Sequence, residues 1–248
     1  MRMSGNTILI TGGTSGIGLG LAQRFHAEDN TVIIGGRREQ LLSAITAEHP
    51  GMESVVVDVA DPGSISRCWA EVTGRHPDLN VVVNNAGIML SEDLSDPDHL
   101  RVAEETVATN LLGPIRLLAE AVPFLAGQSA AVIINVSSGL GFVPLPITPT
   151  YSATKAAVHS FTQSLRVQLA STDVQVVELI PPGVQTDLMG QAARGQGMPL
   201  PAFLTEVMDI LRSYPNVVEV CVKDVLPLRH AEAQGRHDDM LAMLSGAH

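Results

Sequence analysis

Short apolar runs alternate with segments of helical periodicity along this 248-residue chain, and this feature constrains the fold most. The apolar runs are almost continuous, which is typical of strands buried on both faces of a parallel sheet. Parallel strands joined by helices need right-handed crossovers, so helices cover both faces. We therefore predict a single α/β domain with a doubly wound sheet, whose strands lie at residues 7–10, 31–34, 54–57, 80–83, 131–135 and 174–179.

Helices are predicted between these strands from their start signals and apolar stripes. Asp61-Pro62 combines an N-cap residue with proline at the first helical position. The helix that follows carries one apolar stripe, and a helix that begins near Tyr151 carries another. The stripe residues are Ile65, Cys68, Trp69 and Val72 in the first of these helices and Val158, Phe161, Leu165 and Leu169 in the second.

Charge and composition exclude several classes of function. A formal net charge of −11 disfavours binding to nucleic acid or anionic lipid, because the field repels polyanions. Cys68 and Cys221 are far apart in the sequence, which indicates free thiols in a reducing cytoplasm. No run of about 18 apolar residues predicts a membrane span, and the eight histidines form no metal-ligand pattern. We expect a cytoplasmic protein without metal, nucleic-acid or membrane partners.

A glycine-rich turn, TGGTSGIG at residues 11–18, follows the first predicted strand and opens the first helix. Glycine lets the backbone approach a pyrophosphate, whose charge is met by free N–H groups and the positive end of the helix dipole. This interpretation makes Gly12, Gly16 and Gly18 candidates for cofactor binding. An ordinary tight turn would also use glycine, and the spacing differs from the common G-x-G-x-x-G fingerprint. The turn alone leaves both interpretations open.

The end of the second predicted strand indicates which dinucleotide would bind. An acidic residue there would bind the adenosine ribose and repel a 2′-phosphate, whereas an arginine accommodates that phosphate. Here the segment reads Ile34-Gly35-Gly36-Arg37-Arg38 and holds no acid. NADP(H) is therefore favoured over NAD(H), with Arg37 as the first phosphate partner. The alternative is a solvated helix start, although a helix N-terminus is a poor place for cations.

Tyr151 and Lys155 are four residues apart in a predicted helix, so their side chains share a face. A phenol loses its proton at about pH 10, and acid–base work near neutrality needs a nearby positive charge, which Lys155 would supply. Chance Tyr-x-x-x-Lys pairs are common on helices. The position of this pair after a strand that ends in Ser137-Ser138 favours chemistry.

Together these motifs resemble those of the classical short-chain dehydrogenase/reductase (SDR) family, whose fold is of the Rossmann type. The resemblance covers residues 6–188 in the family's order and spacing. The matched positions are the glycine turn, Asp58, Asn84-Asn85-Ala86-Gly87, Asn110, Ser138, Tyr151, Lys155 and Pro182-Gly183-x-x-Thr186. The Gly-Arg-Arg segment and the C-terminal tail are similar to a subgroup linked with D-alanine transfer in teichoic-acid metabolism.

The resemblance implies a role for each matched residue. Tyr151 would exchange a proton with the substrate oxygen during hydride transfer, Ser138 would bind that oxygen, and Lys155 would lower the pKa of Tyr151 and hold the nicotinamide ribose. Asn110 would bend its helix and anchor a water that relays protons; an asparagine that only caps a kink is the alternative. The implied cofactor contacts are Gly12, Thr14, Ser15, Gly16, Ile17, Gly18, Arg37, Arg38, Asp58, Val59, Asn85, Ala86, Gly87, Tyr151, Lys155, Pro182, Gly183 and Thr186, of which Asn85 could instead brace the sheet.

The C-terminal part departs from the family pattern. Residues 190–201 are rich in Gly and Pro, which predicts a mobile loop within a substrate lid at about 188–215. The tail after Val217 lacks the usual strand with a glycine-rich end, so we favour a homodimer through the helices with Asn110 and Tyr151 over a tetramer. An apolar substrate pocket is predicted from Leu140, Phe142, Val143, Leu145, Ile147, Leu188 and Met189, with the alternative that some of them only cover the core.

Two functions are compatible with these residues. The first is an NADP(H)-dependent oxidoreductase that interconverts a small-molecule carbonyl and an alcohol. The second is a non-catalytic dinucleotide sensor or scaffold of the same fold. A sensor needs the glycine turn but not the catalytic set of Asn110, Ser138, Tyr151 and Lys155, so the intact set favours the enzyme.

Overall fold

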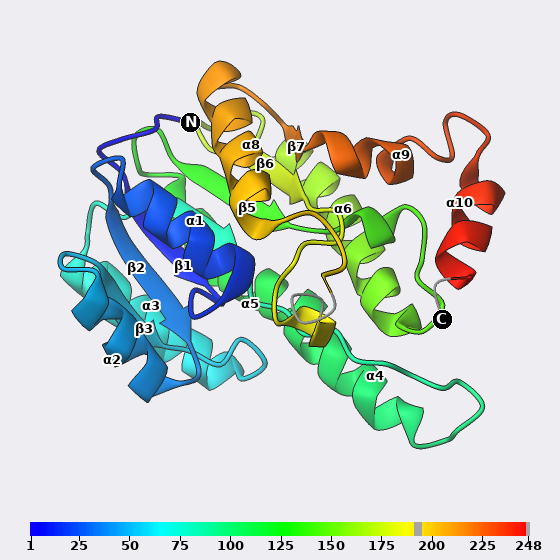
Figure 1. Ribbon diagram of the computed structural model, residues 1–248. Helices are drawn as coiled ribbons and strands as arrows, with labels where there is room; N and C mark the ends of the chain where they lie inside the picture. Colours follow the sequence, from blue (N-terminus) through cyan, green and yellow to red (C-terminus); the bar gives the residue numbers. More distant parts are fainter. Residues whose placement is uncertain (191–194, 247–248) are drawn as a thin grey trace.

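The computed structural model describes residues 1–190 and 195–246, in which one seven-stranded sheet lies between two layers of helices (Figure 1). The strand order is β3-β2-β1-β4-β5-β6-β7, and all neighbouring strands are parallel. The predicted doubly wound sheet is therefore confirmed. The strands are β1 (Thr7–Thr11), β2 (Thr31–Gly36), β3 (Glu53–Val56), β4 (Val81–Asn84), β5 (Val132–Val136), β6 (Gln175–Ile180) and β7 (Glu219–Cys221).

Alternate strand residues point into two apolar cores, one on each face of the sheet. Ile8 and Ile10 belong to the core under α1 (Gly16–His26), α2 (Glu39–Glu48) and α8 (Leu200–Ser213), where α1 and α8 pack side by side (Figure 1). Leu9 belongs to the core under α3 (Pro62–Arg75), α5 (Gly113–Leu125) and α6 (Pro149–Gln168). Because both faces are covered, the strands need apolar residues at successive positions, which explains the continuous apolar runs.

Helix α3 begins as its sequence predicts. The Asp61 carboxylate accepts a hydrogen bond of 2.8 Å from the Gly63 N–H, and Pro62 occupies the first turn. The predicted stripe is buried against the sheet, and Trp69 meets Phe124 of α5 edge to face at 5.6 Å. The start and the buried face of this helix are therefore confirmed.

The segment after Val217, where no strand was predicted, contains β7 paired with β6. This strand has only three residues, too few to show a period of two. It is followed by η4 (Lys223–Val225), α9 (Leu226–Arg229) and α10 (His237–Ser245), which lies at one side of the molecule (Figure 1). Within the described residues, no helix has the length and apolar character needed to cross a membrane.

The predicted lid at about 188–215 contains residues 191–194, which lie outside the described residues. Before them is η3 (Leu188–Gly190), and after them Met198 and Val184 form an isolated bridge. Helix α8, inside the predicted lid, buries Phe203, Val207 and other apolar residues in the core beside α1. The lid remains a prediction. Helix α8, which begins at Leu200, is part of the core and not of a separate lid.

Candidate active site

The loops at the carboxyl ends of β1 to β6 surround a cavity of about 490 Å³. This is the expected ligand position in an open α/β sheet. All of the predicted site residues except Asn110 line the cavity: Gly12, Thr14, Ser15, Gly16, Ile17, Gly18, Arg37, Arg38, Asp58, Val59, Asn85, Ala86, Gly87, Ser138, Tyr151, Lys155, Pro182, Gly183 and Thr186. Residues from distant parts of the sequence therefore share one site.

The glycine turn is packed too closely for larger residues. A Cβ atom at Gly12, which has a φ of +67°, would lie 2.8 Å from the Cα of Ala86, and one at Gly18 would lie 2.3 Å from the Gly12 carbonyl oxygen. In helix α1 the N-cap Ser15 makes no side-chain cap, and the first turn carries no acidic residue. The first N–H groups and the positive end of the helix can therefore receive an anionic group, as a phosphate cradle requires.

Arg37 and Arg38 line the cavity beyond the end of β2. The Arg38 Nη2 donates a hydrogen bond of 2.9 Å to the Thr14 hydroxyl, which ties this arginine to the glycine turn. The sequence favoured Arg37 as the phosphate partner, whereas the structure holds Arg38 against the turn. Two guanidinium groups thus lie at the β2 end of the cavity, where an adenosine 2′-phosphate would be accommodated.

Ser138, Tyr151 and Lys155 come together where β5 ends and α6 begins, and all three side chains are buried. The Lys155 Nζ donates a hydrogen bond of 2.8 Å to the Val136 carbonyl and lies 5.6 Å from the centroid of the Tyr151 ring. Burial raises the pKa of Tyr151 to about 12, opposed by a hydrogen bond with Ser138. Burial lowers the pKa of Lys155 to about 8, opposed by the charge of Glu178. The pKa of Tyr151 is therefore raised and not lowered, contrary to the expectation from the resemblance, because burial is the dominant influence.

Asn110 lies behind the cavity in a π-helical turn, η1 (Ala108–Leu112), between α4 (His99–Val107) and α5. Its Oδ1 accepts a hydrogen bond from the Ile88 N–H and its Nδ2 donates one to the Ile88 carbonyl, both at 2.8 Å. The side chain thus fixes the loop after β4, and the bend that the resemblance implies remains a prediction. The water relay through Asn110 remains a prediction.

Asn85 braces the sheet end, the alternative that its sequence left open. Its Nδ2 donates hydrogen bonds to the carbonyl oxygens of Thr11, at 3.0 Å, and Gly12, at 3.2 Å. These bonds hold the loop after β4 against the glycine turn. Asn85 also lines the cavity, so bracing and cofactor contact are compatible.

The substrate side of the cavity is apolar and includes residues that sequence reasoning missed. Leu140, Leu145 and Leu188 line it as predicted. Val143 is fully buried away from the cavity, and Phe142 packs against the core and the ring of His159. Leu228 of α9 and Leu244 of α10 complete the lining. No local signal in the tail indicated that these two leucines return to the site.

Comparison with known proteins agrees with this geometry. The family model of short chain dehydrogenases matches residues 6–197. The "Uncharacterized oxidoreductase DltE" of Bacillus subtilis is 42% identical over 199 residues, which are 80% of this chain and 79% of that protein. This similarity bears out the predicted subgroup.

Solved structures show the same fold. A short chain dehydrogenase from Burkholderia cenocepacia in complex with NADP has a TM-score of 0.82 and 23% identity, covering 98% of this chain and 99% of that one. A short chain dehydrogenase/reductase from Burkholderia phymatum in complex with NAD also has a TM-score of 0.82, with 19% identity over 98% and 96% of the two chains. The chain described here belongs to the short-chain dehydrogenase family of oxidoreductases, in a subgroup similar to DltE.

Proposed function

We propose that the protein is an NADP(H)-dependent oxidoreductase that interconverts a carbonyl and an alcohol, with Tyr151 as general acid and base. One observation carries this proposal: the Ser138, Tyr151 and Lys155 side chains line the same cavity as the glycine turn. A dinucleotide whose pyrophosphate lies on the turn would extend along the cavity toward Tyr151. The cofactor, when bound, supplies or accepts the hydride.

The protein groups supply the proton and stabilise charge. In reduction the Tyr151 hydroxyl donates its proton to the substrate oxygen, and the Lys155 ammonium stabilises the phenolate that remains. The Ser138 oxygen accepts a hydrogen bond of 3.1 Å from the Leu140 N–H, and its own hydrogen, directed at Tyr151 in the free protein, would turn to the same substrate oxygen. In oxidation the Tyr151 phenolate takes the proton back.

The cofactor preference rests on the arginine pair. Solved structures of the fold hold either NADP or NAD, so the fold alone does not select between them. Arg37 and Arg38 place two positive charges beyond β2, and the bond from Arg38 to Thr14 holds one of them near the phosphate cradle. This arrangement favours NADP(H), because a 2′-phosphate would meet charge-assisted donors there.

The substrate class follows from the cavity wall. Leu140, Leu145, Leu188, Leu228 and Leu244 line the cavity that also contains Tyr151. We infer a largely apolar carbonyl or alcohol, because few groups there could satisfy a charged substrate. We also keep the prediction of a cytoplasmic homodimer through α6 and the helices around Asn110, where Val167 of α6 is 77% exposed.

The proposal is tested by fluorescence titration with NADPH and, separately, with NADH. We expect tighter binding of NADPH, and a loss of roughly 10- to 100-fold in its affinity in the Arg37→Ala/Arg38→Ala double variant with little change for NADH. Arg101→Ala is the matched control, since its side chain is 81% exposed on α4. A preference for NADH would overturn the NADP(H) assignment, and failure to bind either dinucleotide would overturn the function.

A further inference from the structure

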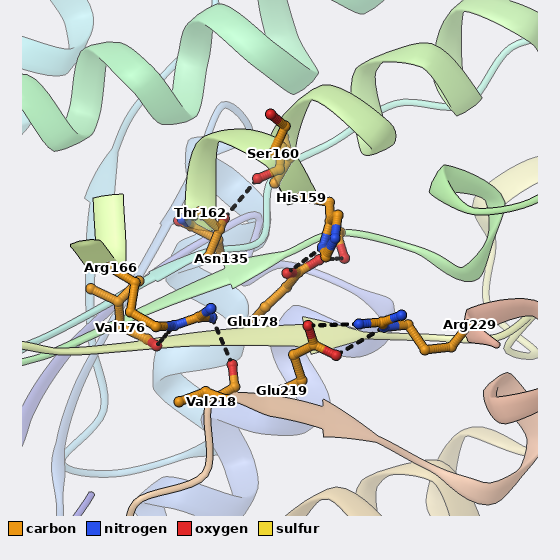
Figure 2. A network of polar contacts seen from close by, with 12 residues as sticks. Asn135, His159, Ser160, Thr162, Arg166, Val176, Glu178, Val218, Glu219 and Arg229 are labelled. Atoms are coloured by element: carbon orange, nitrogen blue, oxygen red, sulfur yellow. Dashed lines mark hydrogen bonds and ion pairs between the residues drawn. The ribbon is translucent and has the colours of Figure 1, made fainter. Parts of the chain in front are cut away.

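The face of α6 that covers the sheet behind Lys155 is unusually polar. Four side chains repeat there with helical spacing and form hydrogen bonds with groups of β5, β6 and the residue before β7. Figure 2 shows His159, Thr162 and Arg166 in this network with the strands. The four residues are Lys155, His159, Thr162 and Arg166.

Glu178 of β6 lies at the centre of this network and is completely buried. Its Oε1 accepts a hydrogen bond of 2.5 Å from the Ser137 hydroxyl, and its Oε2 lies 2.8 Å from the Nδ1 of His159. A carboxylate can only accept, so the His159 ring places a proton on Nδ1. Both carboxylate oxygens therefore have hydrogen-bond partners. A buried negative charge of this kind needs a nearby positive one.

The charged and titratable groups around Glu178 come from three elements. Helix α6 contributes Lys155, His159 and Arg166, strand β7 contributes Glu219 and Cys221, and α9 contributes Arg229. Arg229 is already engaged, because its Nε and Nη2 form a fork on the Glu219 carboxylate at 2.8 and 3.0 Å. Arg166 donates to the carbonyl oxygens of Val176 and Val218. Lys155, only 5% exposed, is the buried cation that can balance Glu178.

A metal ion is a poorer explanation of the same cluster. In the described part of the chain, His159, Glu178 and Glu219 offer ligand atoms within 4.8 Å of one another. Arg229 forms an ion pair with Glu219 (Figure 2), however, and the Glu178 oxygens already accept from Ser137 and His159. The network is satisfied without an ion.

We propose that Glu178, held in place by Ser137 and His159, is a positioning residue that keeps the Lys155 ammonium charged beside Tyr151. The geometry gives the link: Ser137 precedes the catalytic Ser138, and His159 follows Lys155 by one helical turn, so Glu178 connects the two catalytic segments from behind. The pKa of Lys155, which burial lowers, is raised by Glu178. The catalytic consequence rests on the proposed function, whereas the effect on Lys155 does not.

The chain offers a direct test, because Lys155 and Lys223 are its only lysines. Protein labelled with ¹³C at lysine Cε gives two NMR signals, assigned with Lys223→Arg, and their titration is followed without cofactor or substrate. We expect the Lys155 midpoint to fall by roughly half a pH unit or more in Glu178→Gln and to recover in part in Glu178→Asp, which restores the charge. The matched control is Glu53→Gln, because Glu53 pairs with His76 at 3.1 Å at the far edge of the sheet and should leave Lys155 unchanged.

An unchanged Lys155 midpoint in Glu178→Gln would overturn the proposal. If that variant does not fold, Glu178→Asn provides the second neutral side chain and the same criterion applies. In turnover assays the alkaline limb of the pH profile should move to lower pH together with the Lys155 midpoint. A shifted midpoint in a protein that reduces no carbonyl would leave this inference standing and remove the proposed function instead.

Discussion

Helices α3 and α6 cover the same face of the sheet but bury different kinds of side chain. The buried residues of α3 are Ile65, Cys68, Trp69 and Val72, with Ser64 as the one polar member. The buried stripe of α6 mixes Val158 and Leu165 with Tyr151, Lys155, Thr162 and the partly buried His159. Apolar burial stabilises a fold with no further requirement, whereas each buried polar group must find a partner. Helix α3 thus secures the sheet, whereas α6 uses part of its buried face for polar groups, among them those of the proposed chemistry.

The largest effect should come from Tyr151→Phe, which removes only the reacting hydroxyl of α6. We expect carbonyl reduction to fall by roughly 10²- to 10⁴-fold, the usual contribution of general acid catalysis. NADPH affinity, measured by fluorescence, should change little. Tyr214→Phe is the control, since the chain has two tyrosines and Tyr214 is 65% exposed. Full activity of the Tyr151 variant would contradict the assigned role.

The complementary change in α3 is Ile65→Ala. The Ile65 side chain is 1% exposed in the core, so its truncation should lower the free energy of unfolding by about 2–5 kcal/mol. Urea unfolding measures this loss, and the folded variant should keep the wild-type kcat/KM. Val56→Ala, at a 49% exposed position, should lower the free energy of unfolding far less. If the Ile65 variant kept its stability but lost activity, the assignment of a purely stabilising role to α3 would be wrong.

The pH dependence of kcat/KM should follow the charge of Lys155 on α6. The pKa of Lys155 is about 8, so its ammonium is charged below that pH and neutral above it. Tyr151 keeps its proton through this range because burial raises its pKa to about 12. We therefore expect kcat/KM for reduction to be flat near neutrality and to fall by up to about tenfold per unit above pH 8. A profile that stays flat beyond about pH 9.5 would contradict this assignment.

The smallest effect should follow Thr162→Val, in the polar part of the α6 stripe. The Thr162 hydroxyl accepts a hydrogen bond of 3.0 Å from the Asn135 Nδ2 and donates one of 2.7 Å to the Val158 carbonyl. Its loss should lower the free energy of unfolding by roughly 1–3 kcal/mol, because the buried amide loses an acceptor. Thermal unfolding measures the change. Turnover should be unaffected. A large loss of turnover would show that Thr162 has more than a structural role.

The sequence predicted most of the sheet and the residues gathered around Tyr151 because both carry local signals. Six strands follow from apolar runs, and Tyr151, Lys155 and the glycine turn follow from spacing. Strand β7 is too short for a pattern, and Leu228 and Leu244 reach the cavity only through tertiary packing. The polar network behind the site has a signal in the sequence: Glu178 interrupts a strand predicted to be buried on both faces, and His159 lies one turn after Lys155.

Hydride transfer itself tests the central claim most directly. NADPH with both C4 hydrogens of the nicotinamide replaced by deuterium is incubated with the protein and a panel of apolar aldehydes and ketones, and the products are examined by mass spectrometry. The account predicts an alcohol that carries deuterium on the former carbonyl carbon, formed by the wild type and not by Tyr151→Phe. Carbonyl consumption without deuterium in the product, or equal transfer by the Tyr151 variant, would contradict it.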